Sequence, residues 1–354
     1  MIDYSMKDLL RTSIANGASD LHVTVGVPPM LRISGSFKKY PKDPVTPEDA
    51  EKLVCEIMNP DQKARLDKNG EVDFCIAFAG NRFRVNAYSQ KGYYAAALRM
   101  INNNIRTFQE LGLPPLFREL CLRPRGLILV TGPTGSGKST TLASMIDTIN
   151  QNRSAHIITI EDPIEYYHTH KRCIVNQREI GQDTKSFGNA LRAALRQDPD
   201  VIQVGEMRDL ETISTALTAS ETGHLVLSTL HTNNAANTID RIVDVFPAYQ
   251  QAQVRFQLSN VLQAVISQQL LVRKDGSGRV AALEIMLAHP AISSLIREGK
   301  TTQIDNTIST NSKMGMQLMD KALADLYKGG VVTYDEAYMH CINPDDFKRK
   351  ATEY

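Results

Sequence analysis

The fold is decided by residues 126–140, which read GLILVTGPTGSGKST. The apolar run at 126–131 predicts a buried strand, and Gly132 to Ser139 have the glycine-rich spacing of a Walker A motif. Glycines allow backbone N–H groups to curl around phosphates, and a helix that begins at Ser139 directs its positive end at the same phosphates. This stretch therefore predicts a P-loop that binds ATP.

Each part of this loop has an expected chemical role. Lys138 can reach the β- and γ-phosphates, and Ser139 can bind Mg²⁺. The alternative, a glycine turn with a surface lysine, explains neither the strand before the loop nor the helix expected at 140–149. We expect Lys138 to lie on the solvent side. The nucleotide is expected to contact Gly132, Pro133, Thr134, Gly135, Ser136, Gly137, Lys138, Ser139 and Thr140.

Beyond the loop, apolar runs alternate with helical segments. The runs occupy residues 156–160, 201–204 and 225–230. Continuous apolar runs of this length suit a parallel sheet that is covered by helices on both faces. This part of the chain is therefore expected to be an α/β domain.

Two acids follow the ends of these runs, Glu161 after the first and Glu206 after the second. The second resembles a Walker B motif with Gly205 where an Asp commonly stands. Because ligands bind at the carboxyl ends of strands in α/β sheets, we expect both acids to be catalytic and Glu206 to hold Mg²⁺ together with Ser139. Either acid alone could instead cap a helix.

Two histidines flank the third run, His224 before it and His231 after it. Side chains seven residues apart on a strand point to opposite faces, so these histidines are not expected to form a metal-binding pair. A lone histidine is more often a hydrogen-bonded core residue than a functional one.

The first hundred residues have a different pattern. Short alternating segments lie at 21–25, 30–33, 72–78, 82–88 and 93–100, with helical segments at 3–16 and 47–58. Alternation predicts an antiparallel sheet, so we expect a small α+β domain. The expected boundaries are 1–105 for this domain, 106–117 for a linker, and 118–354 for the ATPase domain with C-terminal helices.

The tail of the chain predicts two further features. Apolar residues at 254, 258, 261, 262, 265 and 266 share one helical face, and 281–287 read as a strand. In segment 290–299, Ile292, Leu295 and Ile296 give a short helix an apolar face. That helix either packs on its own domain or passes domain motion to a partner.

Composition excludes several classes of protein. The chain has 354 residues, long enough for two domains, and 40 Lys and Arg balance 39 Asp and Glu, which gives no support for nucleic-acid binding. The five scattered cysteines include no CxxC pair, so a four-cysteine zinc site is not expected. Scattered single cysteines fit a reducing compartment. With no signal peptide and no apolar run of membrane-spanning length, we expect a cytoplasmic protein that meets the membrane only through partners.

Four blocks in this order resemble the secretion ATPase superfamily of hexameric motors. Its Walker A, Asp, Walker B and His boxes match residues 132–139, 157–165, 200–209 and 222–232. The resemblance is closest to the PilT family of type IV pilus retraction ATPases and spans nearly the whole chain, including residues 18–22, 28–35 and 204–213. The departures are Gln197, where the family usually has Glu, and AISSLIRE at 291–298, where it has AIRNLIRE.

The resemblance implies a fold, partners and further site residues. It implies a PAS-like N-terminal domain, a RecA-like ATPase core, a homohexamer, ATP between the two domains, and an inner-membrane platform protein of the pilus machine as partner. Arg84 and Arg99 match arginines expected to reach the phosphates, and His231 belongs to the His box as a candidate catalytic residue.

Other functions compete with this interpretation. Pilus-assembly and type II secretion ATPases carry a longer N-terminal region and typically a tetracysteine zinc module, which this sequence does not contain. A small-molecule kinase would need a lid with paired arginines, and a helicase would need basic loops. A nucleotide-binding scaffold that does not hydrolyse ATP is the fourth alternative.

Overall fold

The computed structural model of the chain describes residues 3–33, 35–101 and 104–352. These residues form two compact units, Met1–Asn104 and Ile105–Tyr354. The interval 106–117, expected to be a linker, contains the short helix α4 (Phe108–Leu111) and the start of α5 (Leu116–Cys121). Leu113 and Phe117 are buried in the core of the second unit, so most of this interval packs with that unit.

The N-terminal unit is built on one antiparallel sheet. Its described residues form six strands in the order β3-β2-β1-β6-β5-β4. The strands are β1 (Asp20–Val23), β2 (Met30–Ile33), β3 (Ser36–Lys39), β4 (Glu71–Phe78), β5 (Asn81–Gln90) and β6 (Tyr93–Ile101). The helices are α1 (Met6–Ala15), α2 (Pro47–Glu56) and α3 (Pro60–Asn69).

Alternation along these strands separates an apolar face from a polar one. Leu21 lies between Leu31 and Leu98 in register, and the row continues through Val85 to Phe74; all five are buried. Apolar residues of α1 and α2 belong to the same core. Because side chains alternate between faces, the residues one position along each strand form a row on the opposite face.

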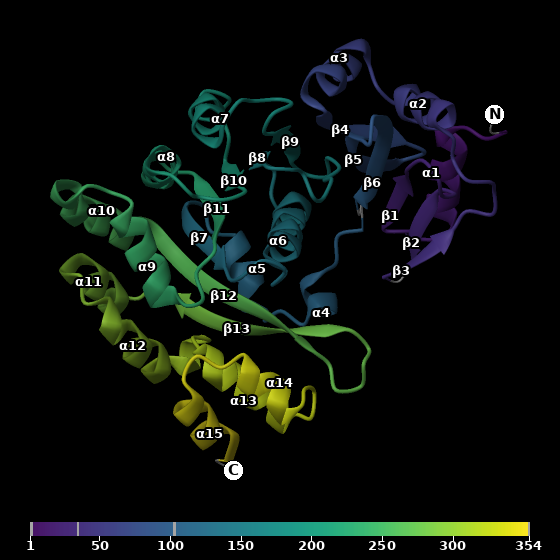
Figure 1. Ribbon diagram of the computed structural model, residues 1–354. Coiled ribbons are helices and arrows are strands. Elements are labelled where there is room, and N and C mark those ends of the chain that lie inside the picture. Colours follow the sequence, from purple (N-terminus) through teal and green to yellow (C-terminus); the bar gives the residue numbers. More distant parts are fainter. Residues whose placement is uncertain (1–2, 34, 102–103, 353–354) are drawn as a thin grey trace. The chain divides into compact units, whose positions relative to one another are not determined.

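The C-terminal unit is built on a mostly parallel sheet (Figure 1). Its described residues form seven strands in the order β13-β12-β7-β11-β10-β8-β9, and only β13 runs antiparallel to its neighbour. The strands are β7 (Gly126–Thr131), β8 (His156–Glu161), β9 (Ile174–Glu179), β10 (Val201–Val204), β11 (Leu225–Leu230), β12 (Leu262–Val272) and β13 (Arg279–Leu287). Every residue of β7, β10 and β11 is buried, as a sheet covered on both faces requires.

Helices of this unit connect the strands and extend the chain beyond them. The connecting helices are α6 (Lys138–Asn152), α7 (Phe187–Ala194), α8 (Leu210–Glu221), α9 (Ala235–Asp244) and α10 (Ala248–Val261). After β13 follow α11 (Pro290–Glu298), α12 (Ile304–Thr310), α13 (Met319–Lys328), α14 (Tyr334–Met339) and α15 (Pro344–Thr352). The last three have a small core of their own with Leu271 and Ala282 of the β12–β13 hairpin. Among the described residues, no helix is long and apolar enough to cross a membrane.

The structure corrects one expectation for the tail and bears on a second. The single helical face drawn from residue 254 to 266 is wrong, because α10 ends at Val261 and β12 follows parallel to β7. Residues on both faces of β12 are buried, so its apolar pattern does not distinguish strand from helix. The apolar face of α11 turns inward: Ile292 and Ile296 belong to the main core and Leu295 packs against it. This packing fits the alternative in which the helix packs on its own domain. Transfer of motion to a partner stays a prediction.

Candidate active site

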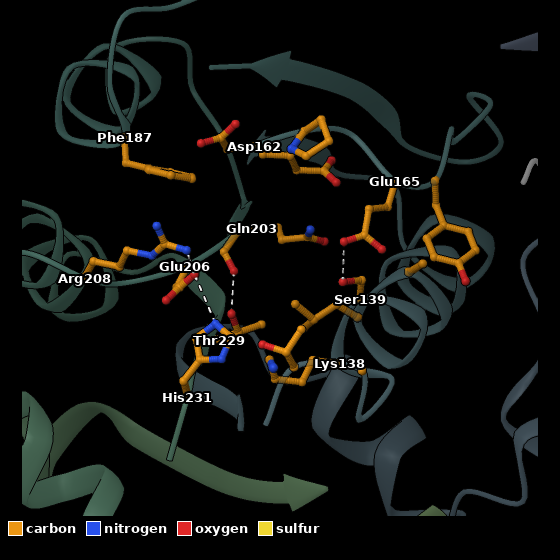
Figure 2. A pocket seen from close by; sticks show the side chains of 18 of the residues that line it. Lys138, Ser139, Asp162, Glu165, Phe187, Gln203, Glu206, Arg208, Thr229 and His231 are labelled. Carbon is orange, nitrogen blue, oxygen red and sulfur yellow. Dashed lines mark hydrogen bonds and ion pairs between the residues drawn. The ribbon is translucent and has the colours of Figure 1, made fainter. Parts of the chain in front are cut away.

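A hollow lies beside the P-loop at the carboxyl ends of β8, β10 and β11 (Figure 2). These strands are parallel neighbours, so the residues that follow each of them converge at one edge of the sheet. The hollow is lined by the loop residues Thr134 and Gly135, by Lys138 and Ser139 of α6, and by Glu161, Glu206 and His231. The chemistry-bearing residues that the sequence assigned to this unit therefore meet in one place.

The backbone of the loop depends on its glycines. Gly132 has a φ of +141°, and a Cβ at this position would lie 2.2 Å from the carbonyl oxygen of Gln268. Helix α6 begins immediately after Gly137, which has a left-handed conformation. The N–H groups at the start of α6 thus face the loop, as the phosphate-binding interpretation requires.

Lys138 is more enclosed than the sequence suggested. Its exposed fraction is 9%, and its ammonium group donates to the carbonyl oxygens of Gly132 (2.8 Å) and Pro133 (3.0 Å). Burial lowers the pKa of Lys138, and the carboxylates of Glu206 and Glu165 counteract that shift. The expectation of a solvent-side lysine is wrong, because the loop wraps around the side chain.

Gln268 of β12 braces the P-loop and was missed by sequence reasoning. Its Nε2 donates to the carbonyl oxygen of Ser136 at 2.7 Å, and its Oε1 accepts from the hydroxyl of Thr141 at 2.8 Å. Gln268 is buried and lies on β12, the strand that pairs with β7 beside the P-loop. No motif marks it, and β12 contains two other glutamines, Gln263 and Gln269, so nothing local distinguishes Gln268.

Ser139 contacts a carboxylate that was not assigned a role. Its hydroxyl donates to Oε1 of Glu165 at 2.9 Å, as Figure 2 shows. Glu165 ends the Asp box that begins at residue 157, so its position in that box was the available signal. Hydroxyl and carboxylate oxygens are ligands that Mg²⁺ prefers, and these two fit a magnesium site.

Glu206 lies at the centre of a charged cluster (Figure 2). Its Oε2 accepts from Nη2 of Arg208 at 2.7 Å and lies 3.3 Å from Nε2 of His231. Burial raises the pKa of Glu206, but the hydrogen bond from Arg208 and the charge of His231 outweigh it, so the pKa lies below its ordinary value. The carboxylate is therefore held ionised. Arg208 was not among the candidate site residues, and its contact with Glu206 was not predicted.

Glu161 has the opposite electrostatic environment. Its exposed fraction is 9%, and its Oε1 accepts from the hydroxyl of Thr159 at 2.6 Å and from Nε2 of Gln177 at 3.1 Å. Burial is the largest influence and raises the pKa of Glu161 to about 7. A carboxylate with a pKa near neutrality is suited to accept a proton.

Gly205 explains the unusual Walker B sequence. Its N–H donates to the carbonyl oxygen of Ile160 at 2.7 Å, and a Cβ at this position would lie 3.1 Å from the same oxygen. Its carbonyl oxygen accepts from the hydroxyl of Thr229 at 2.6 Å. A larger side chain would press on the end of β8, where Glu161 stands.

The two histidines have different surroundings. His231 lines the hollow and contacts Glu206. His224 lies at the other end of β11, where its Nδ1 is 2.9 Å from the carbonyl oxygen of Ala219. His224 therefore joins a helix end to a strand, and only His231 belongs to the candidate site.

The two candidate arginines of the N-terminal unit are cross-strand partners. Arg84 of β5 and Arg99 of β6 lie opposite each other in register, on the polar face of the sheet. Nε of Arg99 donates to Oδ1 of Asp20 at 2.8 Å, and Nε of Arg84 is 3.8 Å from Asp73. The Arg99 side chain is 74% exposed. Bonding through Nε leaves the outer nitrogens of Arg99 free for an anionic ligand.

A second hollow adjoins the P-loop at β12 and β13. Gly137, Thr140 and Thr141 form one wall and Leu113, Leu270 and Val280 supply apolar surface. Arg106, Arg273 and Arg279 also line it. This hollow lies against the loop end and the first turn of α6, and its lining residues differ from those of the first hollow.

Comparison with known proteins decides the family. A family described as type II/IV secretion system protein matches residues 1–276. The type IV pilus retractation ATPase PilT of Pseudomonas aeruginosa is 50% identical over 341 residues, covering 96% of this chain and 99% of that protein. The chain belongs to the PilT family of type II/IV secretion system proteins. It is accordingly an ATPase that binds adenine nucleotide.

Further relatives agree with this assignment. A twitching motility protein of Neisseria gonorrhoeae is 48% identical over 345 residues, covering 97% of this chain and 92% of that protein. The crystal structure of the pilus retraction motor PilT with bound ADP superimposes with a TM-score of 0.92 at 54% identity, covering 98% of this chain and all of that one. The predicted fold class, a RecA-like ATPase core with an N-terminal sheet domain, is confirmed.

Proposed function

We propose that this ATPase works as a homohexamer that retracts a type IV pilus at the inner face of the cell membrane. The observation that carries the proposal is full-length similarity to pilus retraction proteins, at 50% identity over 96% of the chain. A type II secretion system protein E of Xanthomonas campestris matches at 38% over only 60% of the chain and 36% of its own length. Secretion and assembly remain the alternative, and kinase, helicase and scaffold functions do not fit the family.

The proposed metal is Mg²⁺, held by the hydroxyl of Ser139. Glu165 lies in hydrogen-bonding contact with that hydroxyl, so it joins Glu206 as a candidate carboxylate for the site. Bound Mg²⁺ would neutralise charge on the β- and γ-phosphates. Glu206 already accepts from Arg208 and contacts His231, so Glu165 is the less engaged of the two carboxylates.

The residues of the chain have separable roles in the proposed reaction. Lys138 binds the terminal phosphates, and the N–H groups of the loop cradle them. Glu161, whose pKa burial raises to about 7, accepts the proton of the attacking water. Glu206 orients that water, and Arg208 and His231 hold its carboxylate in place. The nucleoside end of ATP is proposed to occupy the second hollow, against Leu270 and Val280.

Arg84 and Arg99 are proposed to stabilise the charge that develops on the γ-phosphate. Their pairing across β5 and β6 and the exposure of Arg99 support this role, because both guanidinium groups stand on the same face. If hydrolysis requires these two arginines of the N-terminal unit, it would be coupled to domain movement. The proposed recipient of that movement is an inner-membrane platform protein of the pilus machine, and the proposed location is cytoplasmic.

Counting pili tests retraction against assembly. A strain whose chromosomal copy carries Lys138→Ala should be hyperpiliated and should not twitch, because pili that form are no longer withdrawn. Loss of surface pili would instead identify an assembly ATPase. Light scattering on the purified protein should give a mass near six times 39.3 kDa, and a fully active monomer would contradict the hexamer.

A further inference from the structure

A buried carboxylate that the proposed reaction does not use joins two helix ends. Glu284 of β13 has an exposed fraction of 2%. Its Oε1 accepts from the backbone N–H of Ala235 at 2.7 Å, and its Oε2 accepts from the backbone N–H of Met319 at 3.3 Å. Ala235 and Met319 are the first residues of α9 and α13.

The chemistry of helix ends gives this contact its meaning. N–H groups in the first turn of a helix have no partner within the helix, and the positive end of the helix dipole favours an anion there. The side chain of the N-cap residue Leu318 makes no capping hydrogen bond to α13. Glu284 therefore supplies an acceptor that the sequence around Met319 does not provide. In α9 the side chain of Asn234 accepts from the N–H of Asn237, and Glu284 accepts from the N–H of Ala235 at the first helical position.

One of these helices, α9, directly follows the loop at residues 231–234. Helix α9 follows β11 through residues 231–234, which begin with the His231 that contacts Glu206. The hydroxyls of Thr232 and Thr238 lie 2.6 Å apart, which ties this loop to the first turns of α9. A shift of the α9 N-terminus would therefore move His231 relative to Glu206.

The other helix opens the C-terminal helical cluster, α13 to α15. Gln317 pairs with Ile285 through backbone hydrogen bonds of 2.8 and 3.1 Å, and its Nε2 donates to the carbonyl oxygen of Leu283 at 2.8 Å. The residues on both sides of Glu284 therefore hold the chain that leads into Met319. The C-terminal helical cluster, through α13, and the loop at residues 231–234, through α9, are therefore joined at the carboxyl group of Glu284.

We infer that Glu284 is a positioning residue for ATP hydrolysis, which anchors the His231 loop through α9 and ties it to the C-terminal helices through α13. The inference rests on the proposed role of His231 beside Glu206. It assigns the C-terminal helices a function: movement of α13 is felt at His231 through one shared carboxyl group.

The chain offers a matched control for Glu284. Asp320 of α13 is also buried, and its carboxylate accepts from the backbone N–H groups of Ile342 (2.7 Å) and Asn343 (2.8 Å). Both of its partners lie within the C-terminal cluster. Asp320→Asn therefore weakens hydrogen bonds of the cluster and removes none to α9, whereas Glu284→Gln weakens contacts to both helices.

The test is steady-state hydrolysis by full-length variants at a temperature where circular dichroism shows each to be folded. Glu284→Gln should lower kcat about tenfold, because the amide keeps one acceptor oxygen and leaves the other helix N–H without its acceptor, with KM for ATP within about twofold. Asp320→Asn should keep kcat within about twofold. In a His231→Ala background, Glu284→Gln should cause no further loss, because both changes act through one residue.

Ala235→Pro gives a second variant that leaves Glu284 in place. Proline is tolerated at the first helical position, and Asn234 before it is already extended, so the change removes mainly the N–H donor. It should reproduce the loss of kcat. A normal kcat for Glu284→Gln, or an equal loss with and without His231, would overturn the inference. A His231→Ala protein as fast as wild type would instead show that the proposed role of His231 is wrong.

Discussion

The two sheets of this chain present their candidate functional residues in different ways. In the N-terminal sheet, Arg84 and Arg99 stand on an exposed face, as neighbours across two strands. In the C-terminal sheet, the strands are buried on both faces, and Glu161 and Glu206 stand at their carboxyl ends. An antiparallel sheet with one solvated face can display a row of side chains, whereas a covered parallel sheet can offer only its edge.

This difference has energetic consequences. Glu161 is 9% exposed and accepts two hydrogen bonds, so its geometry is set before any ligand binds. Arg99 is 74% exposed and is held through Nε alone. Charges act more strongly in enclosed surroundings than in water. Changes at the edge of the C-terminal sheet should therefore cost more activity than changes on the face of the N-terminal sheet.

The largest effect is expected from Lys138→Ala. The change removes the cation that the P-loop encloses, so ATP hydrolysis measured by phosphate release should fall to background. Thermal melting is the necessary control, because Lys138 is buried and also donates to two carbonyl groups. Normal turnover by a folded Lys138→Ala protein would contradict the P-loop assignment.

Glu206→Gln should separate binding from chemistry. The variant keeps the shape of the side chain and loses its charge, so turnover should drop by about a hundredfold while ATP still binds. Equilibrium binding of a fluorescent ATP analogue measures the second part. The exposed Glu211 of α8, which pairs with Arg192 outside the hollow, gives a control: Glu211→Gln should hydrolyse ATP at the wild-type rate.

The raised pKa of Glu161 predicts a pH dependence. The base must be ionised to accept a proton, so kcat/KM, which reports the pKa of the free enzyme, should fall below a pH of about 7, by about tenfold for each further unit. Glu161→Gln should be slow throughout and lack this limb. The same shift means that the folded state loses stability as pH rises from about 4.5 to about 7, because the ionised side chain is buried. A wild-type profile that is flat from pH 5.5 to 8 would exclude Glu161 as the base.

The smallest effect is expected at Asp20, which holds Arg99 from the same face of the sheet. Asp20→Asn weakens the 2.8 Å contact with Nε but keeps the guanidinium group, so turnover should fall only about two- to threefold. Glu51→Gln is the control, because Glu51 pairs with Lys63 elsewhere in the same unit. A loss as large as that of Glu206→Gln would remove the contrast between the two sheets.

Local signals in the sequence predicted the P-loop, the strands around it and the acids at their ends. Each of these depends on a short segment, such as the apolar run of β7 followed by Gly132, and local segments keep their meaning in the fold. The pairing of Glu206 with His231 was not predicted, although both residues were candidates. It arises because β10 and β11 are parallel neighbours that end at the same edge.

Contacts between distant segments could not be predicted from the sequence. Gln268 reaches Ser136 across 132 positions of the chain, and Glu284 reaches Ala235 across 49. Neither residue belongs to a motif, and a polar residue inside an apolar strand has no local partner that would reveal its role. The packing of α11 was left open for a related reason: an apolar stripe does not say which surface covers it.

The central claim is that one ATP molecule is hydrolysed by groups from both sheets. It is tested most directly by measuring the ATP dissociation constant and kcat on one preparation of the Arg84→Ala/Arg99→Ala double variant. The dissociation constant should stay within about twofold of wild type, because the P-loop is intact, while kcat should fall at least about tenfold. A double variant that binds ATP and turns it over at the wild-type rate would show that the N-terminal sheet takes no part in the chemistry.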